Sequence, residues 1–418
     1  MTILIAGGGI AGLTLALSCH QAGIACRVFE QSDSIRPLGV GINLQPHAVR
    51  ELFELGLELE LEAIGVRTRE VAYFAKTGKP IWSEPRGQLA GYNWPQYSVH
   101  RGQMQLMLLD AVRRRLGQKI VETGMELTGF EDHASRVVAR FRDASGHHVE
   151  VEGDMLIAAD GIHSAARRKL FPDEGSPVWG GAILWRGTAW VEPFLSGATM
   201  AMAGHEDQKF VTYPISRPDP QSGRQLTNFI AELKTDPSAG WRREDYNRKA
   251  NLADFMPQFE DWRFDWLDIP ALIRSAEAIF EYPMIDRDPL DWWTKGHVTL
   301  IGDAAHPMYP IGSNGASQAI VDARVLVREL LAHGIHRDAL IAYEAERRPA
   351  TAAIVEANRG NGPDIVMQIV EERCGGKFDD IEDVLPADER ARIAADYKQL
   401  AGFDIEGLNT RGPLVAVS

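Results

Sequence analysis

The sequence predicts an α/β fold in which a parallel sheet is interrupted by a sheet-rich insert and followed by a helical C-terminal region. Three observations predict it. The first stretch of about thirty residues reads strand–turn–helix–strand, the size of a βαβ unit. Residues 180–285 contain short apolar segments spaced like antiparallel strands. From residue 296 a buried strand and a long helix return, and the last part of the chain is mostly helical.

Composition limits the classes of function. The chain has 418 residues, of which 45% are hydrophobic, so it can bury a sizeable core. A formal net charge of -14 disfavours nucleic-acid binding, which needs a basic surface. The 3 cysteines are too loosely spaced for a disulfide framework or a zinc site, and no metal is expected. We see neither a signal peptide nor a membrane-spanning stretch, and therefore expect a cytoplasmic protein that binds no membrane.

The first element is an apolar β run at residues 2–6, followed by a glycine cluster and a helix. The cluster GGGIAG fits the pattern G-x-G-x-x-G between a strand and a helix. Gly7 permits the tight turn, Gly9 lets the backbone approach a pyrophosphate, and Gly12 allows close helix–strand packing. The N-terminal end of the helix offers free N–H groups to the phosphates.

The second β run, residues 24–30, ends on Glu30. A carboxylate at this place, about 20 residues after the glycines, accepts hydrogen bonds from a ribose diol. Strand, turn, helix, second strand and terminal acid agree with one another, so the context predicts a Rossmann-like dinucleotide site. The acid favours NAD or FAD over NADP.

The middle of the chain alternates between helices and strands. We expect a helix from about His47, strands over 66–100, a long helix over 101–116 and hairpins over 124–157. A buried strand then runs into Asp160-Gly161. Taken alone, this pair is more typical of a turn than of a binding site.

The most informative segment is GDAAHPMYPIGSNGASQAI at residues 302–320. A buried strand ends at Gly302-Asp303, and Asp303 is suited to a ribityl hydroxyl of FAD. A loop rich in glycine and proline then enters a helix near Ala316. Backbone amides at a helix start favour negative charge, which reduced flavin carries on its pyrimidine side. The alternative is a purely structural connection.

These three motifs, in this order, resemble the single-component flavoprotein aromatic hydroxylases, the para-hydroxybenzoate hydroxylase-like family. Several segments, among them WRG, YPI and MYPIGSNGASQAI, are most similar to members that modify phenazines. The resemblance implies a Rossmann-like FAD-binding fold of the glutathione reductase type. It divides the chain into FAD-binding parts 1–70, 101–178 and 286–360, substrate-domain parts 71–100 and 179–285, and a C-terminal helical region 361–418.

The resemblance also implies residues for each task. The cofactor-binding set is Gly7, Gly9, Ala11, Gly12, Glu30, Gln31, Val40, Gly41, Arg101, Asp160, Asp303, Gly312, Asn314, Gly315 and Ala316. Catalysis is assigned to Arg186, Tyr213 and Pro310, and substrate binding to Tyr73, Trp185, Phe229 and Met308. Arg186 has two equal interpretations: it pairs with a substrate carboxylate, or it braces the flavin. We expect His306 to be a structural loop residue.

The implied activity is hydroxylation of an aromatic substrate, expected to be a carboxylate, with phenazine-like acids among the candidates, using O2 and NAD(P)H through a flavin C4a-hydroperoxide. NADH is favoured, and the family implies a homodimer. A flavin-dependent halogenase is one alternative, because Trp262, Trp266 and Ile269-Pro270 nearly match its motif, with Lys76 and Lys79 as candidate lysines. A non-catalytic flavin redox sensor is the other.

Overall fold

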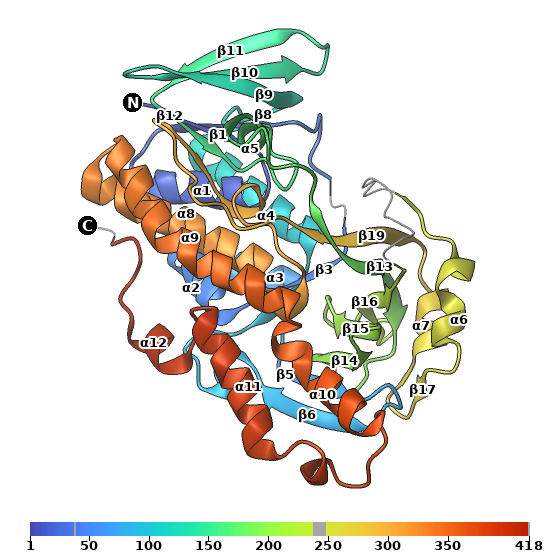
Figure 1. Cartoon of the computed structure of the whole chain (residues 1–418). Helices are drawn as coiled ribbons and strands as arrows, with labels where there is room; N and C mark the ends of the chain where they lie inside the picture. Colours follow the sequence, from blue (N-terminus) through green and yellow to red (C-terminus); the bar gives the residue numbers. More distant parts are fainter. Residues whose placement is uncertain (37–38, 237–247, 417–418) are drawn as a thin grey trace.

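The computed structural model describes residues 1–36, 39–236 and 248–416, and its elements are labelled in Figure 1. A five-stranded parallel sheet has the order β20-β12-β1-β2-β8. Its strands are β1 (Ile3–Ala6), β2 (Cys26–Glu30), β8 (Val121–Thr123), β12 (Met155–Ala158) and β20 (Val298–Leu300). β1, β12 and β20 are buried throughout, as expected of parallel strands covered on both faces.

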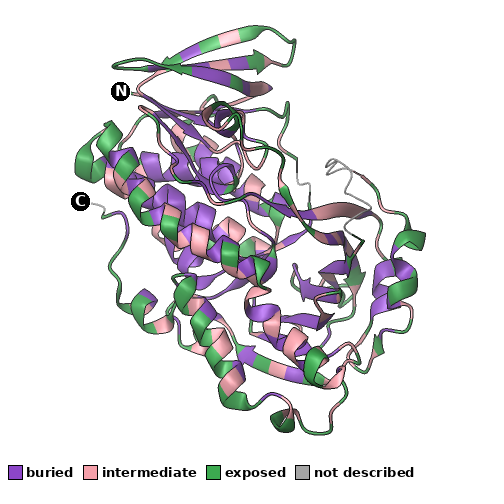
Figure 2. Cartoon of the chain, in the orientation of Figure 1, coloured by how far each residue is buried: buried purple, intermediate pink, exposed green. Residues whose placement is uncertain are grey.

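Helices pack against this sheet and against one another. They include α1 (Ile10–Gln21), α2 (Pro46–Glu54), α3 (Glu58–Ile64), α4 (Arg101–Leu116), α5 (Ala165–Leu170), α8 (Gly315–His333) and α9 (Arg337–Arg359). α1 packs on both α8 and α4, and α9 covers α8. Buried residues concentrate on the parallel sheet, α1 and α8 (Figure 2). The predicted helices over 101–116 and from about residue 316 are confirmed.

A second sheet of seven strands lies beside this part, in the order β19-β13-β16-β15-β14-β5-β6 (Figure 1). Its strands are β5 (Glu70–Phe74), β6 (Pro80–Pro85), β13 (Val178–Val191), β14 (Thr199–His205), β15 (Gln208–Pro214), β16 (Gln225–Lys234) and β19 (Ile279–Asp286). Most neighbours are antiparallel, and β14 pairs with β5 in parallel. The sheet-rich insert is therefore confirmed as one large sheet.

Side chains alternate between the two faces of the large sheet, and this decides which of them can reach a ligand. One face packs on α6 (Met256–Phe259) and α7 (Ile269–Arg274). Trp185 and Phe229 belong to that face: Trp185 stacks on Phe255 at 4.8 Å between ring centroids. The opposite face, which carries Arg186, lines the cavity described below. The predicted place of Trp185 and Phe229 in the substrate site is therefore wrong.

This placement predicts a purely structural role for Trp185. Trp185→Ala removes a stacked ring that is 4% exposed and should lower the free energy of unfolding by about 3–5 kcal/mol. Trp190→Ala, on the same strand but 43% exposed, is the matched control and should change it by less than about 0.5 kcal/mol. Chemical denaturation measures both. Ligand affinity lost without loss of stability would show that Trp185 reaches the substrate after all.

Two smaller sheets and the C-terminal helices complete the structure. β9 (Met125–Asp132), β10 (Val137–Asp143) and β11 (His148–Gly153) form an antiparallel sheet at one end, as the hairpin pattern predicts. β7 (Tyr97–His100) pairs with β3 (Gly41–Leu44) and β4 (Gly65–Arg67), although it falls in segment 71–100, whose strands were assigned to the substrate domain. The domain boundaries themselves stay a prediction.

The C-terminal region holds α10 (Ile365–Cys374), α11 (Ala387–Leu400) and α12 (Ile405–Thr410). Figure 1 shows α10 and α11 running along the large sheet near β5 and β6. Val366, Met367 and Val370 of α10 share a core cluster with Val71 and Tyr73 of β5. Across the three described ranges, every helix is too short or too polar to cross a membrane.

Candidate active site

A large cavity lies where the carboxyl ends of the parallel strands meet the inner face of the seven-stranded sheet; its volume is about 310 Å³ and it is partly open to solvent. Binding sites of open α/β sheets occur at this end of the strands. The residues after β1, β12 and β20 line one side, namely Gly9, Ala11, Gly161 and Asp303. The other sides come from β3, the segment 308–316 and the large sheet.

The glycines after β1 differ in what makes each of them necessary. Gly7 has φ +114°, and a Cβ there would lie 2.2 Å from the carbonyl oxygen of Ala159. A Cβ on Gly12 would lie 2.0 Å from the carbonyl oxygen of Gly7. A Cβ on Gly9 would meet no protein atom within 4 Å, and Gly9 lines the cavity. Gly7 and Gly12 are thus required by the fold, whereas Gly9 leaves an open cradle at the start of α1.

The residues predicted for the adenosine end lie just beyond this cradle. Glu30 ends β2, and its carboxylate accepts hydrogen bonds from the backbone N–H groups of Gly8 (2.7 Å) and Ser32 (2.9 Å). Gln31 follows it and is exposed. These contacts fix the Glu30 carboxylate beside the glycine turn, and its contact with a ribose stays a prediction.

Arg101 and Asp303 both line the cavity between its two ends, and both are exposed to it. Arg101 begins α4, and its backbone N–H donates to the carbonyl of Val40 at 2.9 Å. Asp160 lies differently: its carboxylate accepts the backbone N–H of Ala165 (2.8 Å) at the start of α5. Its neighbour Gly161 lines the cavity and Asp160 does not. A direct contact of Asp160 with a pyrophosphate therefore stays a prediction.

The loop over residues 310–316 is braced by the C-terminal region. Gly312 has φ +68°, and a Cβ there would lie 2.0 Å from the Tyr397 hydroxyl. The Asn314 amide donates to this hydroxyl (3.0 Å), which donates to Asn358 Oδ1 (2.9 Å). The Asn358 amide in turn donates to the carbonyl of Tyr309 (3.2 Å). Sequence reasoning missed Tyr397 and Asn358, because no motif links residues so far apart.

Tyr397→Phe tests this brace. The change leaves Asn358 without its donor and takes one acceptor from Asn314, so the loop loses part of its fixed conformation. We expect the dissociation constant of FAD from the apoprotein to rise at least about fivefold, measured by flavin fluorescence.

Tyr92→Phe is the matched control for Tyr397→Phe. The Tyr92 hydroxyl is also buried and donates to the carbonyl of Phe403 at 2.6 Å, and not to a residue of the loop. It should cost similar stability and leave FAD affinity unchanged. Equal FAD affinity in the two variants would contradict the brace.

Next to this loop, which β3 contacts, three side chains of the large sheet hold β3. Asn228 Oδ1 accepts a hydrogen bond from the backbone N–H of Gly41 at 2.8 Å, and Arg186 Nη2 donates to the carbonyl of Gly41 at 2.9 Å. A Cβ on Gly41 would lie 2.6 Å from the Tyr213 ring. Burial raises the pKa of Tyr213, the Arg186 charge lowers it, and the balance is about 12. Tyr213 is therefore a neutral hydroxyl at neutral pH.

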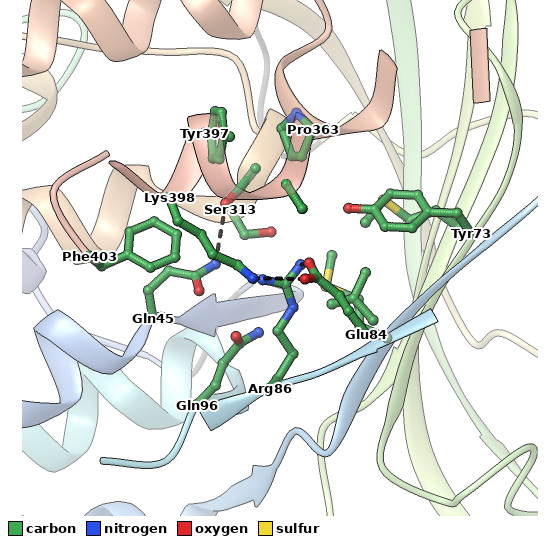
Figure 3. A pocket seen from close by; sticks show the side chains of 15 residues that line it. Gln45, Tyr73, Glu84, Arg86, Gln96, Ser313, Pro363, Tyr397, Lys398 and Phe403 are labelled. Atoms are coloured by element: carbon green, nitrogen blue, oxygen red, sulfur yellow. Dashed lines mark hydrogen bonds and ion pairs between the residues drawn. The ribbon is translucent and has the colours of Figure 1, made fainter. Parts of the chain in front are cut away.

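Other predicted residues are distributed over two cavities. Met308, Pro310, Gly312, Asn314, Gly315 and Ala316 line the large cavity together with Arg186 and Tyr213. Tyr73 instead lines a smaller adjoining cavity with Glu84 and Arg86 (Figure 3). Met200 and Met202 line both cavities and so separate them. The assignment of Tyr73 to the main site is thus corrected to a neighbouring one.

The large cavity is also lined by an ionic cluster that the sequence did not reveal: Lys209, Glu232 and Asp364. Lys209 could have been found, because it alternates with Val211 and Tyr213 along β15. Asp364 carries no such signal, since it lies in the short turn before α10.

The remaining sequence candidates have structural partners. His306 Nε2 lies 2.5 Å from Asp322 Oδ2, in a buried pair behind the loop, as a structural role requires. Lys76 pairs with Glu371, and Trp262 and Trp266 pack on the outer face of the large sheet. The halogenase residues therefore lie away from the cavity. Among the residues that the structure describes, no group of His, Cys, Asp and Glu forms a metal site.

The site fits FAD. It offers an open cradle at a helix start, an elongated cavity and a glycine-rich loop at the start of α8. The buried Oδ1 of Asn314 in this loop has no hydrogen-bond partner within the described residues and can accept from a ligand.

Comparisons with known proteins agree with this geometry. A family model described as FAD binding domain matches residues 1–358. The chain is 46% identical to phenazine 1,6-dicarboxylic acid hydroxylase PhzS of Lysobacter antibioticus, over 85% of this chain and 89% of the relative. It is 32% identical to 3-amino-4-hydroxybenzoate 2-monooxygenase PtnB3 of Streptomyces platensis, over 98% of both.

The fold is shared with solved structures. Klebsiella pneumoniae HpxO complexed with FAD and uric acid superposes with a TM-score of 0.72 at 24% identity, covering 96% of this chain and 92% of that one. NAD(P)H is the usual reductant of such hydroxylases. With the family model, the relatives and the cavity in agreement, the chain belongs to the FAD-binding-domain family and is an FAD-dependent aromatic monooxygenase.

Proposed function

We propose that this enzyme hydroxylates a fused-ring aromatic carboxylate of the phenazine type, using O2 and NADH. The observation that carries the proposal is the lining of the cavity. Its walls there are apolar, formed by Leu184, Met200, Met202, Val211 and Ile230, and a guanidinium lies at the flavin end. The relative that is 46% identical is named for a phenazine dicarboxylic acid.

Each part of the site has a task in this proposal. Gly9, Arg101, Asp303 and the loop 312–316 hold FAD, which when bound takes electrons from the nicotinamide and activates O2. The apolar wall holds the aromatic ring by contact and keeps water out. Arg186 supplies positive charge and binds a carboxylate or orients β3. Pro310 fixes the loop backbone next to the ring, and Tyr213 donates a hydrogen bond from its neutral hydroxyl.

The test measures NADH consumption by the FAD-loaded enzyme with phenazine-1-carboxylate, and with salicylate as the monocyclic comparator. We expect consumption to rise at least about tenfold with the phenazine and a product that carries one added oxygen atom. Stimulation by salicylate alone would contradict the fused-ring class. NADPH in place of NADH tests the nicotinamide preference.

The alternatives make different predictions for the same assay. A halogenase would give a chloride-dependent product, and a redox sensor would show no stimulation by any aromatic acid. The positions of Lys76, Trp262 and Trp266 outside the cavity disfavour the first, and the catalytic relatives disfavour the second. The homodimer and the cytoplasmic location stay predictions.

A further inference from the structure

One wall of the cavity carries charge that the proposed reaction does not use. Lys209 and Tyr213 lie on the same face of β15, four residues apart, so their backbones are separated by about 13 Å. Tyr213 touches β3 beside the flavin loop. Lys209 therefore lies well away from Tyr213 along the cavity wall.

Lys209 is paired with two carboxylates rather than one. Its Nζ lies 3.3 Å from Glu232 Oε2 and 3.1 Å from Asp364 Oδ2. Glu232 is its direct neighbour across the strands, and Asp364 comes from the turn that precedes α10. The three side chains are only 4%, 7% and 6% exposed, and all three residues line the cavity. The cluster holds one positive and two negative groups.

One carboxylate oxygen of this cluster is unsatisfied. Asp364 Oδ1 is buried and has no hydrogen-bond partner within residues 1–36, 39–236 and 248–416. A buried acceptor without a donor is costly, so such atoms in folded proteins have a partner, protein or otherwise. The other charged residues among the described lining are Arg101, Arg186 and Asp303, and the lining also includes the apolar side chains of Leu184, Met200, Met202, Val211 and Ile230. Because Asp364 lines the cavity, a turn of its carboxylate would bring this oxygen to a donor on a ligand.

We propose that Lys209, Glu232 and Asp364 form a specificity site that accepts a hydrogen bond from a ring hydroxyl or ring N–H on the substrate edge remote from Tyr213 and Arg186. The inference rests on the proposed function. The surplus carboxylate disfavours an ionised carboxylate at that edge, so the acid group of the substrate lies at the opposite edge. The substrate class narrows to a fused aromatic acid with a donor on its far ring.

The test uses three probes that differ at one position: phenazine-1-carboxylate, 6-hydroxyphenazine-1-carboxylate and phenazine-1,6-dicarboxylate. Binding to the FAD-loaded enzyme is followed by the change in flavin absorbance, without NADH. The wild type should bind the hydroxy acid at least about tenfold more tightly than the unsubstituted acid, and the dicarboxylate most weakly. Equal affinity for the hydroxy acid and the dicarboxylate would overturn the proposal.

Variants then locate the effect. Asp364→Asn should reduce the preference for the hydroxy acid at least fivefold, improve binding of the dicarboxylate and leave binding of the unsubstituted acid unchanged. Glu232→Gln, which keeps Asp364, should shift the same two ratios in the same direction. Asp286→Asn is the matched control, because Asp286 is buried and paired with Arg359 but lies outside the cavity. If the ratios of the three affinities in Asp364→Asn equal those of the wild type, the proposed specificity site is refuted.

Failure of the proposed function can be distinguished from failure of the specificity site. If none of the three phenazines perturbs the wild-type flavin spectrum, the substrate class itself is wrong, and the specificity site falls with it. If they bind and are hydroxylated but the affinity ratios ignore Asp364 and Glu232, the reaction stands and only the specificity site is refuted.

Discussion

Gly9→Ala is expected to abolish tight FAD binding in a chain that still folds. Gly9 has an extended backbone with φ of -79°, which alanine adopts without strain. The added methyl group meets no protein atom within 4 Å, but it lies in the cradle at the N-terminal end of α1. Phosphate groups bind there through close approach to backbone N–H groups, and a methyl group prevents that approach.

We expect the dissociation constant of FAD to rise at least about tenfold, which corresponds to about 1.4 kcal/mol of binding free energy. Titration of the apoprotein with FAD, followed by quenching of flavin fluorescence, measures it. The unfolding temperature of the apoprotein should stay at the wild-type value. Unchanged FAD affinity would mean that the pyrophosphate does not lie against the turn after β1.

Two further glycines serve as controls for Gly9→Ala. Gly12→Ala places a methyl group 2.0 Å from the carbonyl of Gly7 and should destabilise the apoprotein itself. Gly129→Ala, in β9, also meets no atom within 4 Å but lies outside the cavity, so it should leave both FAD affinity and folding unchanged. The three variants separate a glycine kept for a ligand from one kept for packing.

Sequence reasoning worked best where local pattern decides structure. The strand before Gly7, the helix after it and the helix over 101–116 depend on periodicity and glycine placement, which local sequence carries. The glycine loop at Gly312 could be recognised from its motif for the same reason. Its brace by Tyr397 could not, because that contact joins segments brought together only by the tertiary fold.

The substrate residues were harder to predict, because strand pairing decides which face a side chain takes. Within Trp185-Arg186 the sequence offers two candidates, and the strand allows only one of them to face the cavity. Burial of the aromatic ring against α6 gives Trp185 the outer face, and Arg186 the inner one. The same alternation places Lys209 on the face of Tyr213, but its ion pair with Asp364 could not be predicted, because that contact joins segments far apart in the sequence.

Replacement of Arg186 is the second change with a large expected effect. Arg186 Nη2 donates to the carbonyl of Gly41, and its Nε has no partner among the described residues. Burial lowers the pKa of Arg186, yet a guanidinium keeps its proton at neutral pH. Arg186→Met removes the charge from the flavin end of the cavity and the donor from β3. We expect kcat/KM for the aromatic acid to fall about 100-fold or more, equal to about 2.7 kcal/mol.

Arg186→Lys decides between the two roles of the guanidinium. Lysine keeps the charge but lacks the planar fork, so it cannot donate to Gly41 and to a carboxylate together. If Arg186 braces β3, both variants should weaken FAD binding and lower the fraction of NADH consumption that yields product, for every substrate alike. If it binds the substrate, FAD affinity should stay constant and KM should rise for aromatic acids but not for their amides. The direct bond to Gly41 leads us to expect the first pattern, with lysine restoring little. A rise in KM confined to carboxylates would establish the second role and would place the acid group of the substrate next to Arg186.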